Sequence, residues 1–67
     1  MSTVLVNGRE QEVVQGETVA ALLGRLGLQG RYALVERNGE PVERGTYEEV
    51  ELVSGDRLVV ARPVAGG

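Results

Sequence analysis

The residues of this chain best suited to chemistry stand at its end, where Gly66 and Gly67 follow Arg62-Pro63-Val64-Ala65. Pro63 has no N–H and stops a strand from continuing in a ladder. The two glycines lack a Cβ, so they can pass through a slot too narrow for other residues. Five extended residues reach at most about 17 Å. This segment could therefore carry the carboxylate of Gly67 into the pocket of a partner.

Three residue types are missing, and their absence excludes most other chemistry. The sequence has no histidine, cysteine or lysine. Without the first two it lacks the usual general base, the usual covalent nucleophile, and any disulfide or thiolate metal site. Without lysine it can neither form a Schiff base nor accept an isopeptide bond on a side chain. The carboxylates show no spacing typical of an acid–base pair. We therefore expect a protein that is not itself an enzyme and that binds no cofactor.

Length, charge and hydropathy limit which class of protein this chain can be. Sixty-seven residues form one small domain, which we expect to span residues 1–67 with a flexible tail at 63–67. The net charge is −3 and no basic cluster occurs, which argues against nucleic-acid binding. No apolar run could span a membrane, and the first residues lack the features of a signal peptide. A cytoplasmic protein, monomeric by default, is expected.

The first half of the chain predicts a hairpin and a helix. Thr3–Val6 and residues 9–14 are typical of two strands, and Asn7-Gly8 between them suits a type I′ turn. Thr18 is a suitable N-cap for a helix over residues 19–26. One apolar face of that helix recurs at helical spacing, and Gly27 then favours a left-handed stop. The face consists of Val19, Leu22, Leu23 and Leu26.

The second half predicts further strands. A strand over Tyr32–Arg37 follows a loop at 29–31, and Asn38-Gly39 predicts another turn after it. Pro41 limits residues 40–42 to a short edge strand. Residues 44–51 are polar and are expected to be irregular, with Tyr47 folding back over the core. Ser54-Gly55-Asp56 predicts a turn before the last strand, Arg57–Arg62.

This order of elements predicts an α+β fold in which one helix packs on a mixed sheet of four to five strands. The first and last strands are apolar on both faces, which indicates central positions. If they are neighbours, they run parallel and are linked through the helix. The result is a β-grasp, or ubiquitin-like, arrangement.

Alternation along the central strands also predicts an apolar patch. Val4, Val6, Leu58 and Val60 should face the helix. Leu5, Val59 and Ala61 should then point to the uncovered face, beside the base of the tail. We expect these three side chains to form a partner-binding patch, although scattered apolar side chains on a surface are also normal.

Over essentially its whole length the sequence resembles the ThiS sulfur carriers of thiamine biosynthesis, which are small relatives of ubiquitin. The similarity rests on a series of short segments, and Glu36 and Arg37 stand where the family more usually has an apolar strand. The segments are Val6-Asn7-Gly8, Thr18-Val19 with Leu22-Leu23, Asn38-Gly39-Glu40 with Val42 and Arg44, Gly55-Asp56, and Pro63-Val64-Ala65-Gly66-Gly67.

This resemblance implies a mechanism that needs no base or metal from the chain. A ThiF-like adenylating enzyme would use ATP to attach AMP to the carboxylate of Gly67. A persulfide donor protein would then supply sulfur, leaving a thiocarboxylate for a ThiG-like thiazole synthase. The resemblance makes Gly67 the modified residue and Gly66 the slot residue, and it makes Val64 and Ala65 contacts of the partner-binding tail.

Three alternatives share the same sequence features. The chain could carry sulfur for molybdopterin synthesis, cysteine synthesis or tRNA thiolation. It could be a ubiquitin-like modifier joined through Gly67 to lysines of other proteins. It could also be an interaction module whose glycines are a frayed end.

Overall fold

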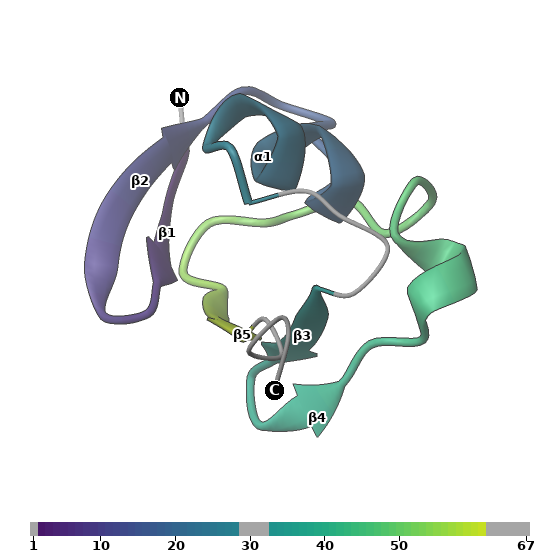
Figure 1. Cartoon of the computed structure of the whole chain (residues 1–67). Coiled ribbons are helices and arrows are strands. Elements are labelled where there is room, and N and C mark those ends of the chain that lie inside the picture. The colour runs from purple at the N-terminus through teal and green to yellow at the C-terminus, as the bar shows by residue number, and fades with distance from the viewer. Residues whose placement is uncertain (1, 29–32, 62–67) are drawn as a thin grey trace.

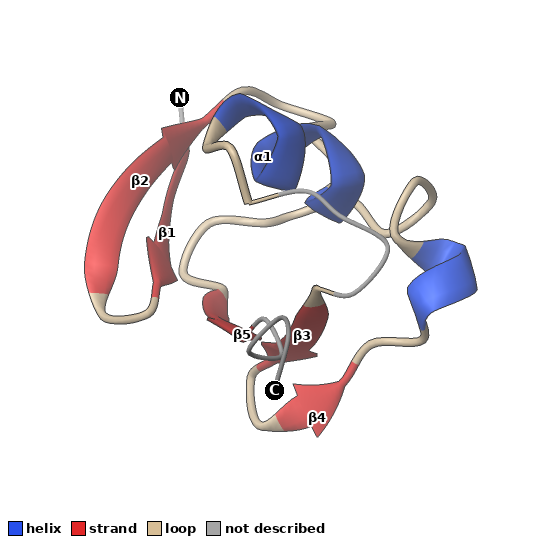
Figure 2. Cartoon of the chain, in the orientation of Figure 1, coloured by secondary structure: helices blue, strands red, loops and turns tan. Residues whose placement is uncertain are grey.

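The computed structural model describes residues 2–28 and 33–61, so the whole predicted tail lies outside the described residues. Within them the structure has five strands, one α-helix and one short 3-10 helix (Figures 1 and 2). The strands are β1 (Ser2–Val6), β2 (Arg9–Val13), β3 (Leu34–Arg37), β4 (Glu40–Pro41) and β5 (Arg57–Ala61), and the helices are α1 (Val19–Arg25) and the 3-10 helix Arg44–Thr46.

The five strands form one mixed sheet in the order β2-β1-β5-β3-β4. β1 pairs with β5 in parallel, while the β1–β2, β3–β5 and β3–β4 pairs are antiparallel. The two ends of the chain therefore supply adjacent strands near the middle of the sheet. The first and last strands are neighbours, and they run parallel, as the sequence predicts for that case.

Two Asn-Gly turns set the register of the sheet. Asn7 and Gly8 have φ angles of 52° and 83°, and Asn38 and Gly39 have 53° and 87°. Positive φ at both central positions defines the type I′ hairpin turn, which asparagine and glycine tolerate best. The predicted turns are confirmed, and each joins two antiparallel strands without a bulge.

The helix begins and ends close to its predicted bounds. The Thr18 hydroxyl accepts a hydrogen bond from the Ala21 N–H at 3.1 Å, as an N-cap does. Leu26 is the C-cap rather than a helical residue, and Gly27 follows with φ 72°. Val19, Leu22 and Leu23 are buried and Leu26 is partly buried, so the predicted apolar face is the face that packs on the sheet.

The core lies between α1 and one face of the sheet (Figure 1). Val4, Val6, Leu58 and Val60 are all at most 8% exposed, which confirms the predicted alternation. On the other face no described helix covers the strands, and we call this side the open face.

The structure also changes two predictions. Residues 44–51 are not wholly irregular, because Arg44–Thr46 forms a 3-10 helix whose turn is closed by hydrogen bonds from Thr46 to the Glu43 carbonyl. The strand predicted from Tyr32 begins at Leu34 in the described residues, and Tyr32 and the loop 29–31 lie outside them. Tyr47 does fold back over the core, where its hydroxyl donates to the Ala33 carbonyl at 3.0 Å.

Candidate partner-binding site

The sequence-predicted site has two parts, and the structure describes one of them. Val64, Ala65, Gly66 and Gly67 lie outside the described residues. Leu5, Val59 and Ala61 lie on β1 and β5, and Ala61 is the last described residue of the chain. The described structure therefore shows the strand that leads to the tail, and the surface around that strand.

The end of β5 is held from both sides. On one side, β3 pairs Leu34 with Ala61 and Val35 with Val60. On the other side, the Asn7 side chain continues the pairing after β1 has ended: its amide N–H donates to the Val60 carbonyl at 3.1 Å, and its oxygen accepts from the Val60 N–H at 2.8 Å. Since Asn7 is also a turn residue, one side chain ties the first hairpin to the last strand. This fixes the position of β5 up to Ala61.

The open face carries an apolar hollow beside β5. Leu34 and Val59 are 50% and 53% exposed, which is high for side chains of this size. With Ala61 and Pro41 they border a hollow of about 280 Å³, whose remaining lining comes from Val35, Glu36 and Val42. We call Leu34, Pro41, Val59 and Ala61 the open-face patch.

Two members of this patch were missed by the sequence reasoning. The sequence pattern places Leu34 in a strand without indicating its face, and Pro41 by itself indicates only an edge strand. Alternation along β3 was the available signal, because an inward Val35 sends Leu34 and Glu36 to the open face. Leu5 was included, but it is only half-buried beside Arg57, its partner on β5, and it does not line the hollow.

A buried carboxylate holds the turn before β5. Asp56 is 3% exposed. Its Oδ2 accepts from the Val53 N–H at 2.9 Å and from the Arg37 Nε at 3.0 Å, and its Oδ1 accepts from the Asn38 amide at 3.1 Å. Burial by itself would raise the pKa of Asp56, but these hydrogen bonds and the charge of Arg37 outweigh it and lower the pKa. Arg37 therefore stabilises the fold.

A second buried carboxylate fastens the start of α1. Glu17 accepts from the Val14 N–H at 3.0 Å and from the Arg25 Nε at 3.0 Å, while another Arg25 nitrogen donates to the Glu12 carbonyl at 2.8 Å. Burial would raise the pKa of Glu17, but the hydrogen bonds from Arg25 and Val14 lower it overall. The network joins α1 to the edge strand β2. Its role is to stabilise the fold.

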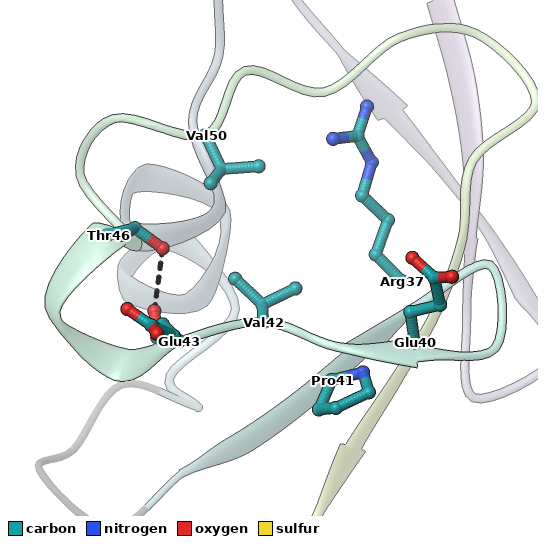
Figure 3. A pocket seen from close by; sticks show the side chains of 7 residues that line it. All are labelled: Arg37, Glu40, Pro41, Val42, Glu43, Thr46 and Val50. Carbon is teal, nitrogen blue, oxygen red and sulfur yellow. Dashed lines mark hydrogen bonds between the residues drawn. The ribbon is translucent and has the colours of Figure 1, made fainter.

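A further groove of about 320 Å³ lies between β4 and the 3-10 helix (Figure 3). Val42 lies near its centre, with Glu43 on one side and Glu40 on the other. Its arginine, Arg37, is already paired with Asp56. Within residues 2–28 and 33–61 there is no group of three carboxylates that could hold a metal ion. The groove therefore offers no chemistry beyond its shape.

The described part of the chain also contains no helix long and apolar enough to cross a membrane.

Fold and surface together define a class of protein. One helix on a five-stranded mixed sheet, with the first and last strands parallel neighbours, is the β-grasp fold of ubiquitin-like proteins. Comparisons with known proteins identify the family within this class. The model of the ThiS family matches residues 4–67. The chain belongs to the ThiS family of β-grasp sulfur carriers.

Solved structures agree with this assignment. The crystal structure of the thiamine biosynthesis protein ThiS from Geobacter metallireducens matches with a TM-score of 0.81 and 31% identity, covering 97% of this chain and 99% of that one. The crystal structure of SAMP1 from Haloferax volcanii matches with a TM-score of 0.61 over 98% of each chain, but at 22% identity it supports the fold alone.

Curated relatives match this chain with only part of their length. A thiazole synthase from Paramagnetospirillum magneticum is 39% identical over 64 residues, and one from Magnetococcus marinus is 37% identical over 62 residues. These matches cover 96% and 92% of this chain but 20% and 19% of the relatives. The chain thus spans about a fifth of the length of the relatives it matches.

Proposed function

We propose that this protein carries sulfur on the carboxylate of Gly67 for thiazole formation in thiamine biosynthesis. The observation that carries the proposal is the extent of the family match, which runs through the glycines to Gly67. The thiazole synthase relatives favour thiamine over other sulfur-requiring pathways, because each contains a region similar to this chain.

The chemistry follows from the weakness of a carboxylate as an electrophile. A carboxylate oxygen of Gly67 attacks the α-phosphate of ATP on an adenylating enzyme, and pyrophosphate leaves. The terminal sulfur of a partner's persulfide then attacks the acyl carbon and releases AMP. A thiol finally attacks the donor protein's sulfur in the acyl disulfide. This releases the thiocarboxylate and leaves a disulfide between that thiol and the donor protein. The carrier supplies the acyl group, so the protein is a co-substrate and not an enzyme.

The remaining residues of the chain give this carboxylate its reach and direction. β5 is held by β3 and by Asn7, so the base of the tail has a fixed origin. Gly66 allows the backbone to enter a narrow slot, and Val64 and Ala65 contact the walls of that slot. The open-face patch beside the origin of the tail is the surface on which partners dock. We place these reactions in the cytoplasm, with the protein acting as a monomer.

The test is carrier-dependent exchange of pyrophosphate into ATP by the adenylating enzyme of the same organism. The wild-type protein should support exchange. Gly67→Ala, and a variant with one residue added after Gly67, should abolish it while retaining the wild-type unfolding transition. Ser54→Ala, in an exposed turn, is a matched control that should remain fully active. Normal exchange with either tail variant would refute the proposed role of Gly67.

A further inference from the structure

Glu36 is a charged side chain in the middle of the open-face patch. On β3 it follows Leu34 by two residues, so both side chains point to the open face. Its cross-strand partners on either side are Val59 on β5 and Pro41 on β4. It also lines the hollow of about 280 Å³ that these residues border. An exposed carboxylate is thus surrounded on three sides by apolar groups.

Among the described residues no side chain forms a hydrogen bond or ion pair with this carboxylate. The cations on β3 and α1 are engaged elsewhere, Arg37 with Asp56 and Arg25 with Glu17. Alternation places three further charges on the open face, Glu10, Glu12 and Arg57, so acidic side chains predominate there. Water stabilises Glu36 in the free protein, and a partner covering the patch would remove that water.

Removing the water has a direct energetic consequence. A carboxylate that loses water without gaining a cation or hydrogen-bond donor weakens binding, whereas one that meets a guanidinium or ammonium group strengthens and orients it. A partner suited to this surface must therefore present apolar side chains around an arginine or lysine. A purely apolar partner, or one with an acidic group at that position, would be rejected.

We propose that Glu36 is a specificity-determining residue, which selects a thiazole synthase surface carrying an arginine or lysine among apolar side chains. This inference rests on the proposed function. Thiazole synthase is the occupant because, in two curated relatives, a region like this chain belongs to a polypeptide of that name. Sharing one polypeptide holds such a region and its enzyme at high effective concentration.

The experiment measures the dissociation constant between this protein and the thiazole synthase of the same organism, at low and at physiological salt. Glu36→Gln keeps the shape of the side chain and removes its charge, and it should weaken binding about tenfold and reduce the salt dependence. Glu36→Arg should weaken binding about a hundredfold, because it opposes the partner's cation. Glu48→Gln removes an exposed charge from a different surface and is the matched control, which should bind like the wild type.

Wild-type or tighter binding by Glu36→Gln would overturn the proposal. A wild-type protein that acquires a thiocarboxylate but does not bind thiazole synthase would also overturn it, while leaving the carrier function intact. Failure to form the thiocarboxylate would instead count against the proposed function. Circular dichroism of each variant should match the wild type, since Glu36 is exposed and contributes no hydrogen bond to another described side chain.

Discussion

Arg37 and Asp56 join the end of β3 to the turn that precedes β5. The Arg37 Nε and Nη2 atoms both lie 3.0 Å from the Asp56 Oδ2. The carboxylate is 3% exposed and the arginine side chain 29% exposed, so the pair is largely shielded from water. The Asn38 side chain extends the link, because its amide donates to Asp56 and its oxygen accepts from the Arg57 N–H at 2.9 Å. The strand that leads to the tail is therefore anchored at its first residue.

Breaking this ion pair should be costly. Arg37→Leu leaves the buried Asp56 carboxylate without its cation and should lower the free energy of unfolding by about 2–4 kcal/mol. For a domain of this size that is a large share of the total stability. Urea unfolding at neutral pH measures the change, with Arg44→Leu, an exposed arginine in the 3-10 helix, as the control. An equal loss of unfolding free energy in both variants would show that the Arg37–Asp56 pair stabilises the fold no more than an exposed arginine does.

Stability should fall in acid because two buried carboxylates have lowered pKa values. The ordinary pKa values are 4.5 for Glu17 and 3.8 for Asp56, and both are lower in the folded protein. The unfolded chain then binds more protons than the native one, so the contribution of these groups is fully present above about pH 4.5 and is lost as the pH falls through the folded pKa values.

Urea unfolding from neutral pH to about pH 3 should therefore show a free energy of unfolding that stays level down to about pH 4.5 and decreases below it. Asp56→Asn should be less stable at neutral pH and should show a shallower decrease. An unfolding free energy that stays constant over this range would contradict the assignment of these two groups.

The Asn7 side chain should contribute to the stability of the fold, beyond the turn conformation that the residue adopts. Asn7→Gly keeps the positive φ without strain but removes both hydrogen bonds to Val60. We expect it to lower the free energy of unfolding by about 1–2 kcal/mol. Asn7→Asp tests the same contact differently, since it keeps the acceptor and loses the donor to the Val60 carbonyl. If Asn7→Gly were as stable as the wild type, the side chain would not be securing β5.

The open-face patch should contribute to binding through Val59. Val59→Ser removes apolar area at the centre of the patch and should weaken binding to the partner enzymes about tenfold. Val53→Ser changes a valine of similar exposure, 56% against 53%, at a position outside the sheet. Comparing the binding affinities of the two variants shows whether the effect is specific to the open-face patch. A loss that is equal in both variants would rule out the patch as a docking site.

The sequence predicts those features that depend on local signals. The Asn-Gly turns, the Thr18 cap and the alternation of Val4 and Val6 each depend on neighbouring residues, and each is confirmed. The adjacency of β1 and β5 could be predicted because both strands are apolar on both faces.

The remaining features depend on residues far apart in the chain. Asp56 and Arg37 are 19 positions apart, and nothing local marks them as partners. The same holds for Asn7 and Val60, which are 53 positions apart. The open-face position of Leu34 follows from alternation only once Val35 is known to point inward, which depends on the pairing of β3 with β5. The 3-10 helix at Arg44–Thr46 has too few residues and too little apolar periodicity to be predicted.

The most direct test of the central proposal is the intact mass of the protein after incubation with its adenylating enzyme, ATP and a persulfide donor. We predict a gain equal to the replacement of one oxygen by sulfur, localised by fragmentation to Gly67 and absent when ATP is omitted. An unchanged mass, in the presence of an adenylating enzyme that thiolates another member of the family, would contradict the proposal that this chain carries sulfur.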